Sequence, residues 1–185
     1  MTRPAGYLIN APNNSGLIGE PGVFYDYILA GNGLFLRAKN AHLAVTICIA
    51  DQLIRGLTRL EHSVELLHGK IPMHLVDLAL SVLSSKPDIE QFLAVTWRGG
   101  YTLTIPEQTQ TPGSVTYQTL PDAVLHIHSH TGDIPPDFSG IDDHDEQGFC
   151  IYAVAGDLRS LCPTVALRLG VYGYFLTLGN EEVFA

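Results

Sequence analysis

The chain has 185 residues, of which 46% are hydrophobic and 16% are charged, so it is not a disordered protein and suits one domain, or one domain with a modest extension. Its net charge of −9 argues against a nucleic-acid partner or an anionic membrane surface, because no basic run offsets it. No apolar stretch reaches the ~20 residues that span a bilayer. The opening residues, MTRPAGYLINAPNN, contain no apolar run of signal-peptide length, so we expect a cytoplasmic protein.

The first 71 residues are predicted to form a β-rich extension. In residues 25–39, β-favouring side chains flank a Gly-Asn-Gly turn, which predicts a hairpin. Residues 42–50, HLAVTICIA, predict a further strand. Residues 51–69 could form a short helix or more strand, and the sequence alone does not decide between them.

Residues 72–185 alternate between short apolar strands and two helical segments. A helix is predicted over 73–85, with Met73, Val76, Leu80 and Leu83 on one face, ending before Pro87. A second, short helix is predicted within SGIDDHDEQG. Strands are predicted over 89–97, 101–105, 115–120, 123–130, 149–156 and 164–178, and a polar loop over 106–114. The fold class predicted is α+β, with a mostly antiparallel sheet flanked by helices.

The three cysteines carry no pattern of covalent or metal chemistry. Cys48, Cys150 and Cys162 are an odd number and form no CxxC pair, so we expect neither a disulfide framework nor a thiolate zinc site. Cys48 and Cys150 are expected to be buried in strands as small apolar residues.

Three histidines in five positions are the most informative feature of the sequence. On a strand, His126, His128 and His130 would project to one side, because side chains alternate between faces. Neutral imidazoles are good Zn²⁺ ligands, and a carboxylate as third ligand would leave one coordination position open, as in catalytic sites. The segment Ser139-x-x-Asp142 also matches a helix capping box, which is compatible with a ligand role for Asp142.

The motif His128-x-His130, eight residues, then Ser139-x-x-Asp142 resembles the JAMM (MPN+, Mov34/PAD-1) metalloprotease motif. The stretch HSH…DFSGIDDHDEQG also resembles the bacterial JAB-like "PRTRC system protein A" group. The usual spacer has seven residues, and Thr131 stands where proline is common. The resemblance covers roughly residues 72–178 and implies a JAB/MPN-like domain over 72–185.

The resemblance implies zinc-dependent hydrolysis of a peptide or isopeptide bond by metal-activated water. Zn²⁺ would be held by His128, His130 and Asp142, and Ser139 would stabilise the oxyanion. Ser129 is expected to face away from the ion.

The family also has an upstream glutamate that acts as the general base. Glu90, which follows the helix and opens a strand, matches its position. Glu107, in the polar stretch 106–114, is the competing candidate. His126 and Asp145 are candidates for contacts behind the metal ligands.

The resemblance also implies a protein or peptide substrate, which in this family is often ubiquitin-like. Two alternative functions stay open at this point. One is a non-catalytic scaffold of the same fold, and the other is a different metal-dependent hydrolase such as a phosphoesterase, which would usually carry two metals and more ligand clusters.

Overall fold

The computed structural model describes residues 3–12, 16–118 and 120–185, and the chain divides into two compact units, Met1–Gly69 and Lys70–Ala185. The predicted boundary, between residues 71 and 72, lies two residues further along the chain. Ile71 belongs with the second unit because its N–H donates to the carbonyl of Val183 at 2.9 Å and its backbone pairs with Phe184. In the described part of the chain, no helix has the length and apolar character needed to span a bilayer.

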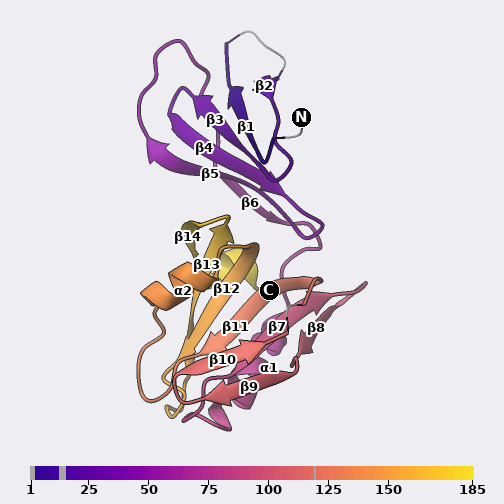
Figure 1. Cartoon of the computed structure of the whole chain (residues 1–185), viewed down its shortest axis with the longest axis vertical. Coiled ribbons are helices and arrows are strands. Elements are labelled where there is room, and N and C mark those ends of the chain that lie inside the picture. The colour runs from indigo at the N-terminus through magenta and orange to yellow at the C-terminus, as the bar shows by residue number, and fades with distance from the viewer. Residues whose placement is uncertain (1–2, 13–15, 119) are drawn as a thin grey trace. The chain divides into compact units, whose positions relative to one another are not determined.

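The N-terminal unit is a six-stranded sheet in the order β2-β1-β3-β4-β5-β6 (Figure 1). Its strands are β1 (Ala5–Ile9), β2 (Ile18–Glu20), β3 (Tyr25–Ala30), β4 (Gly33–Lys39), β5 (Leu43–Asp51) and β6 (Ser63–Leu66). Strands β1 and β3 pair in parallel, and the other neighbours are antiparallel. The predicted hairpin is confirmed as β3 and β4, and the predicted strand at 42–50 as β5.

Two further predictions for this unit are now resolved. Residues 51–69 form no helix, and their ordered element is the strand β6. The prediction that Cys48 is buried is wrong, since it is exposed on β5. The cause is the alternation of faces along that strand, which buries Ile47 and turns the next side chain outward.

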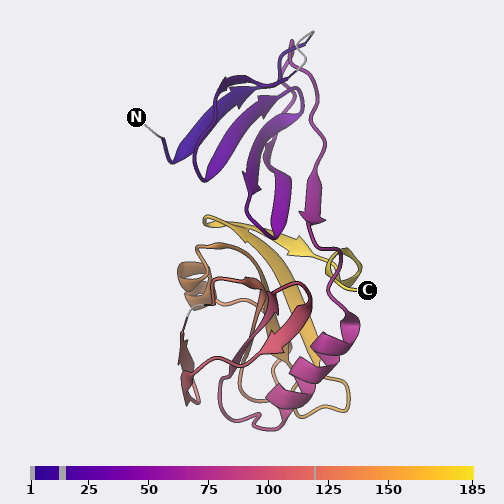
Figure 2. The same cartoon turned by 90° about the vertical axis from the view of Figure 1, so that its right-hand side faces the viewer.

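The C-terminal unit contains a second six-stranded sheet in the order β14-β13-β12-β11-β7-β8 (Figures 1 and 2). Its strands are β7 (Phe92–Trp97), β8 (Tyr101–Thr104), β11 (Ala123–Ser129), β12 (Phe149–Gly156), β13 (Thr164–Val171) and β14 (Tyr174–Leu178). The helices are α1 (Met73–Ser84), α2 (Gly140–Asp145) and α3 (Asn180–Val183). Strands β11 and β12 are parallel and joined through α2, whereas the other pairs are antiparallel. The predicted α+β class with a mostly antiparallel sheet agrees with this architecture.

The packing face of helix α1 overlaps the predicted one at Val76 and Leu83 but is rotated from it. Its buried residues are Leu75, Val76, Ala79 and Leu83, whereas Met73 is 40% exposed. Met73 is the first residue of the helix, where the side chain has only one turn of neighbours to pack against. The apolar stripe is therefore rotated toward Leu75 and Ala79.

The prediction of a polar loop over 106–114 is wrong, because part of this stretch forms a strand in a separate two-stranded sheet. Strands β9 (Gln108–Thr111) and β10 (Ser114–Tyr117) form an antiparallel hairpin. The Gln108 side chain bonds both the N–H and the carbonyl of Phe92, at 2.8 and 3.0 Å, and so ties the hairpin to β7. The Tyr117 ring stacks on the Phe92 ring. These long-range contacts stabilise β9, which its polar composition does not predict. Strand β10 confirms part of the predicted strand at 115–120, and residue 119 of that prediction lies outside the described residues.

Helix α1 and helix α2 lie on opposite sides of the second sheet, and the β9–β10 hairpin lies on the α2 side (Figures 1 and 2). The strand β11 runs between β7 and β12, inside the sheet. Its odd-numbered residues Ile127 and Ser129 are buried, while His126 and His128 face the other side. The α2 side of β11 is therefore where the histidines can meet α2.

We expect Leu83→Ala to lower the free energy of unfolding by about 2–5 kcal/mol, because it deletes a fully buried side chain of α1. Leu78→Ala on the same helix is the matched control, since Leu78 is 50% exposed. Urea unfolding of both variants measures the difference. Equal losses in the two variants would contradict the observed packing face.

Candidate metal centre

Two histidines are placed by the end of β11. In the sheet, His128 pairs with Phe92 of β7 and with Val154 of β12, and His130 follows directly after the strand. The N–H of His130 donates to the carbonyl of Ala155 at 3.2 Å, which keeps this residue against β12. Both imidazoles are thereby held on a backbone that neighbouring strands restrain on each side.

The loop of residues 131–138 then carries the chain to α2 and is anchored to the end of β12. The N–H of Asp157 donates to the carbonyl of Ile134 at 2.8 Å. At Gly156 an added Cβ would lie only 2.4 Å from the nitrogen of Pro136 and 2.5 Å from the oxygen of Ile134. Glycine is needed here because the loop backbone approaches the strand so closely. These contacts define the path of the eight-residue spacer, which places the start of α2 beside the histidines.

The third residue of the group comes from the first turn of α2. The Oγ of Ser139 accepts a hydrogen bond from the N–H of Asp142 at 3.3 Å, and Oδ2 of Asp142 accepts one from the N–H of Ser139 at 2.6 Å. This is the capping box that the sequence predicts. It fixes the rotation of the first turn and turns the Asp142 carboxylate toward β11.

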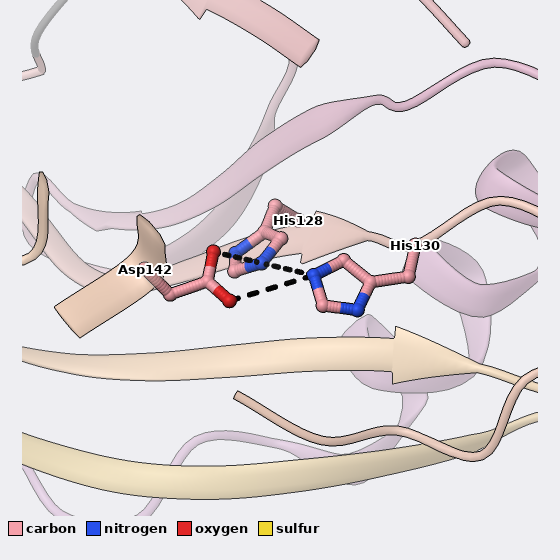
Figure 3. A group of neighbouring side chains, drawn as sticks. All are labelled: His128, His130 and Asp142. Carbon is pink, nitrogen blue, oxygen red and sulfur yellow. Dashed lines mark hydrogen bonds and ion pairs between the residues drawn. The ribbon is translucent and has the colours of Figure 1, made fainter. Parts of the chain in front are cut away.

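His128, His130 and Asp142 point toward one another (Figure 3). The two histidine Nε2 atoms are 3.3 Å apart, and the Asp142 oxygens lie 3.0 Å from Nε2 of His128 and 3.5 Å from Nε2 of His130. Ligands that bind a tetrahedral Zn²⁺ at about 2.0–2.1 Å lie about 3.3 Å from one another. The three side chains thus have the spacing of one face of such a site and could hold a metal ion. We refer to His128, His130 and Asp142 as the metal-binding group.

The charges of this group are strongly coupled. Burial by itself would raise the pKa of Asp142, but hydrogen bonds from His128 and His130 hold that pKa far below its ordinary value. The hydrogen bond to Asp142 raises the pKa of His130 above its ordinary value, against the opposing effect of burial. An ionised carboxylate beside two imidazoles is a donor set suited to a divalent cation of the zinc type.

Glu90 borders the same cavity as His128 and Asp142. This cavity, of about 120 Å³, is also lined by Phe92, Val115, Tyr117 and Ile141. Burial raises the pKa of Glu90, and the charges of the two histidines oppose that rise. The structure therefore brings Glu90 close enough to the metal-binding group for their charges to interact.

The position of Glu90 is set by its neighbour Gln91, which is buried. The N–H of Gln91 donates to Oγ of Ser129 at 3.1 Å, and its side-chain amide donates to the carbonyl of Leu83 at 2.8 Å. Ser129 thus points away from the metal-binding group and toward α1, as the strand alternation predicts. Its hydroxyl secures the chain beside Glu90.

The remaining candidates occupy other surroundings. Glu107 is exposed before β9, and of the two candidate glutamates only Glu90 borders the cavity.

The ring of His126 lies among Phe92, Tyr117 and Tyr152, where its Nδ1 has no hydrogen-bond partner among the described residues. Burial lowers the pKa of His126 to about 4, so its ring is neutral at physiological pH. The exposed carboxylate of Asp145 contacts His144 at 3.1 Å and not a ligand imidazole.

Sequence reasoning missed two residues behind the group, Glu146 and Arg168. Oε1 of Glu146 lies 3.4 Å from Nδ1 of His128, and Oε2 accepts hydrogen bonds from Nε and Nη2 of Arg168 at 3.0 and 2.7 Å. Burial raises the pKa of Glu146, while Arg168 counteracts that rise. An arginine inside the apolar strand TVALRLGV was the available signal, because a buried arginine needs a buried acidic partner.

Compared with family models and with curated proteins, the chain matches none of them.

We expect Arg168→Met to lower the free energy of unfolding by about 3–5 kcal/mol, because it leaves the buried Glu146 carboxylate without its partner. The control is Arg98→Met, whose exposed ion pair with Asp122 should contribute about 0–1 kcal/mol. Chemical denaturation of the two variants provides the comparison. A loss for Arg168→Met no larger than that for Arg98→Met would show that the buried pair is dispensable.

Proposed function

We propose that the C-terminal unit is a zinc-dependent hydrolase of peptide or isopeptide bonds, with a site of the JAMM type. The observation that carries this proposal is the convergence of His128, His130 and Asp142, whose ligand atoms all lie within 4.8 Å of one another. Three protein ligands leave a coordination position open for water, which is the arrangement of catalytic zinc sites. Glu90, on the wall of the same cavity, supplies a carboxylate that is not part of this group.

The chemistry follows from these positions. A Zn²⁺ ion held by the three side chains would act as a Lewis acid and lower the pKa of a water molecule toward ~7. Glu90 would accept a proton from the attacking water and return it to the departing amine, and burial raises its pKa toward the working range of a general base. Its place beside the group, rather than within it, leaves its carboxylate available for this transfer.

Ser139 serves two purposes in this proposal. Its Oγ accepts from the N–H of Asp142, and its hydroxyl proton stays available for donation, since a serine hydroxyl is both donor and acceptor. A hydroxyl at the first turn of α2 can therefore donate to the oxyanion that develops during amide hydrolysis. The substrate class, a protein or peptide that includes ubiquitin-like proteins, is inferred from the motif's resemblance to JAMM proteases.

We expect the purified protein to bind about one Zn²⁺ per chain and His128→Ala or Asp142→Ala to abolish this binding. His144→Ala on α2 is the control, because His144 is exposed and contacts Asp145. Elemental analysis after dialysis against zinc gives the stoichiometry. Full zinc content in either ligand variant would refute the assignment, and two equivalents in the wild type would favour a two-metal hydrolase.

We expect Glu90→Gln to keep zinc at one equivalent and to lose activity by about 10²–10⁴-fold, because an amide cannot take up the proton. Glu107→Gln removes the same charge outside the cavity and should behave as the wild type. Turnover is measured on a quenched-fluorescent peptide library and on isopeptide-linked ubiquitin-like proteins. An active Glu90→Gln beside an inactive Glu107→Gln would transfer the base to the other glutamate. A wild-type protein that binds zinc but cleaves none of these substrates would support the scaffold alternative.

A further inference from the structure

Glu146 connects the metal-binding group to a buried arginine. Its Oε2 is committed to Arg168, and its Oε1 faces Nδ1 of His128 at 3.4 Å. The side chains of Arg168 and Glu146 are only 7% and 9% exposed. One carboxylate oxygen is thus occupied in the interior of the protein, and the other is directed at the histidine nitrogen that faces away from the metal-binding group.

This geometry bears on which nitrogen of His128 carries its proton. The Nε2 atom is the one that faces His130 and Asp142. A neutral imidazole has a single N–H, so a ring that binds a metal through Nε2 must carry its proton on Nδ1. Oε1 of Glu146 is placed to accept that proton in a hydrogen bond. Such partners of metal-bound histidines set the orientation and the basicity of the ring.

Arg168 is itself held in place from several directions. Its guanidinium carbon lies 3.9 Å from the ring centre of Phe138 and 3.8 Å from that of Phe175, so the group is stacked between two aromatic rings. It also forms an ion pair with Asp143 of α2. Arg168 is therefore held by contacts from β14 and from the start of α2, and it holds the Glu146 carboxylate in turn.

We propose that Glu146, held by Arg168, is a positioning residue that selects the Nδ1–H form of His128 and orients its ring for metal binding. This inference rests on the proposed metal site. It assigns the supporting role to Glu146 rather than Asp145, because the Asp145 side chain is 71% exposed and contacts His144, whereas Oε1 of Glu146 lies 3.4 Å from Nδ1 of His128.

The test is the zinc affinity of Glu146→Gln, measured by competition with a chromophoric chelator. Glutamine keeps the shape of glutamate but has only one acceptor oxygen, and Arg168 donates its hydrogen bonds to that oxygen. The amide nitrogen then presents N–H groups to Nδ1 of His128, which disfavours the tautomer that carries its proton on Nδ1. We expect zinc affinity to fall by about 10–100-fold, with a change in the visible spectrum of the Co²⁺-substituted protein. Asp145→Asn removes the adjacent charge without touching His128 and should keep wild-type affinity.

Glu146→Asp provides a second variant in case Glu146→Gln does not fold. Aspartate keeps the charge beside Arg168 but is one methylene shorter, so it withdraws from Nδ1, and we expect affinity to fall here as well. Thermal melting establishes that each variant is folded. Wild-type affinity and an unchanged Co²⁺ spectrum in a folded Glu146 variant would overturn the inference, as would an equal loss in Asp145→Asn. A wild-type protein without zinc affinity would overturn both the inference and the proposed function, whereas a zinc-binding but inactive wild type would overturn the function alone.

Discussion

One carboxylate, that of Asp142, belongs at once to a helix cap and to the metal-binding group. Its Oδ2 accepts the N–H of Ser139 at 2.6 Å, while its Oδ1 lies 3.0 Å from Nε2 of His128. Turning this side chain away would leave the backbone N–H at the start of α2 without this acceptor. The cap therefore keeps the carboxylate facing the histidines, and the rest of the site is arranged around it.

The site concentrates acidic groups in a small volume. Glu90, Asp142 and Glu146 border one cavity, and within this set Glu146 is the one paired with an arginine. Carboxylates gathered in a partly buried site repel one another unless cations or hydrogen bonds offset them. The two histidines provide hydrogen bonds to Asp142, and a bound divalent cation would offset the charge of the group as a whole. The buried Arg168 offsets the charge of Glu146 in the same way, at the border of the same cavity.

The sequence by itself determined the features that depend on neighbouring residues. Alternation along β11 separates His128 from Ser129, and the Ser139-x-x-Asp142 spacing produces the cap, because both are consequences of local backbone geometry. The hairpin of β3 and β4 was predictable for the same reason, since its turn lies between two apolar runs. The grouping of His128, His130 and Asp142 was expected from the resemblance of the motif to JAMM proteases, and the short connection between the strand end and the capped helix start makes it possible.

Contacts between segments far apart in the chain were decided only by the tertiary structure. The strand β9 has a polar sequence that predicts a loop. Its order comes from the Gln108 side chain, which bonds the backbone of Phe92, and from pairing with β10, whose Tyr117 ring stacks on Phe92. The pairing of Glu146 with Arg168 joins residues 22 positions apart through the packing of α2 on β13. Glu90 likewise reaches the cavity because Gln91 bonds Ser129, 38 positions away. No local pattern encodes such partners, because burial and the dielectric environment that makes them necessary exist only once the sheet has formed.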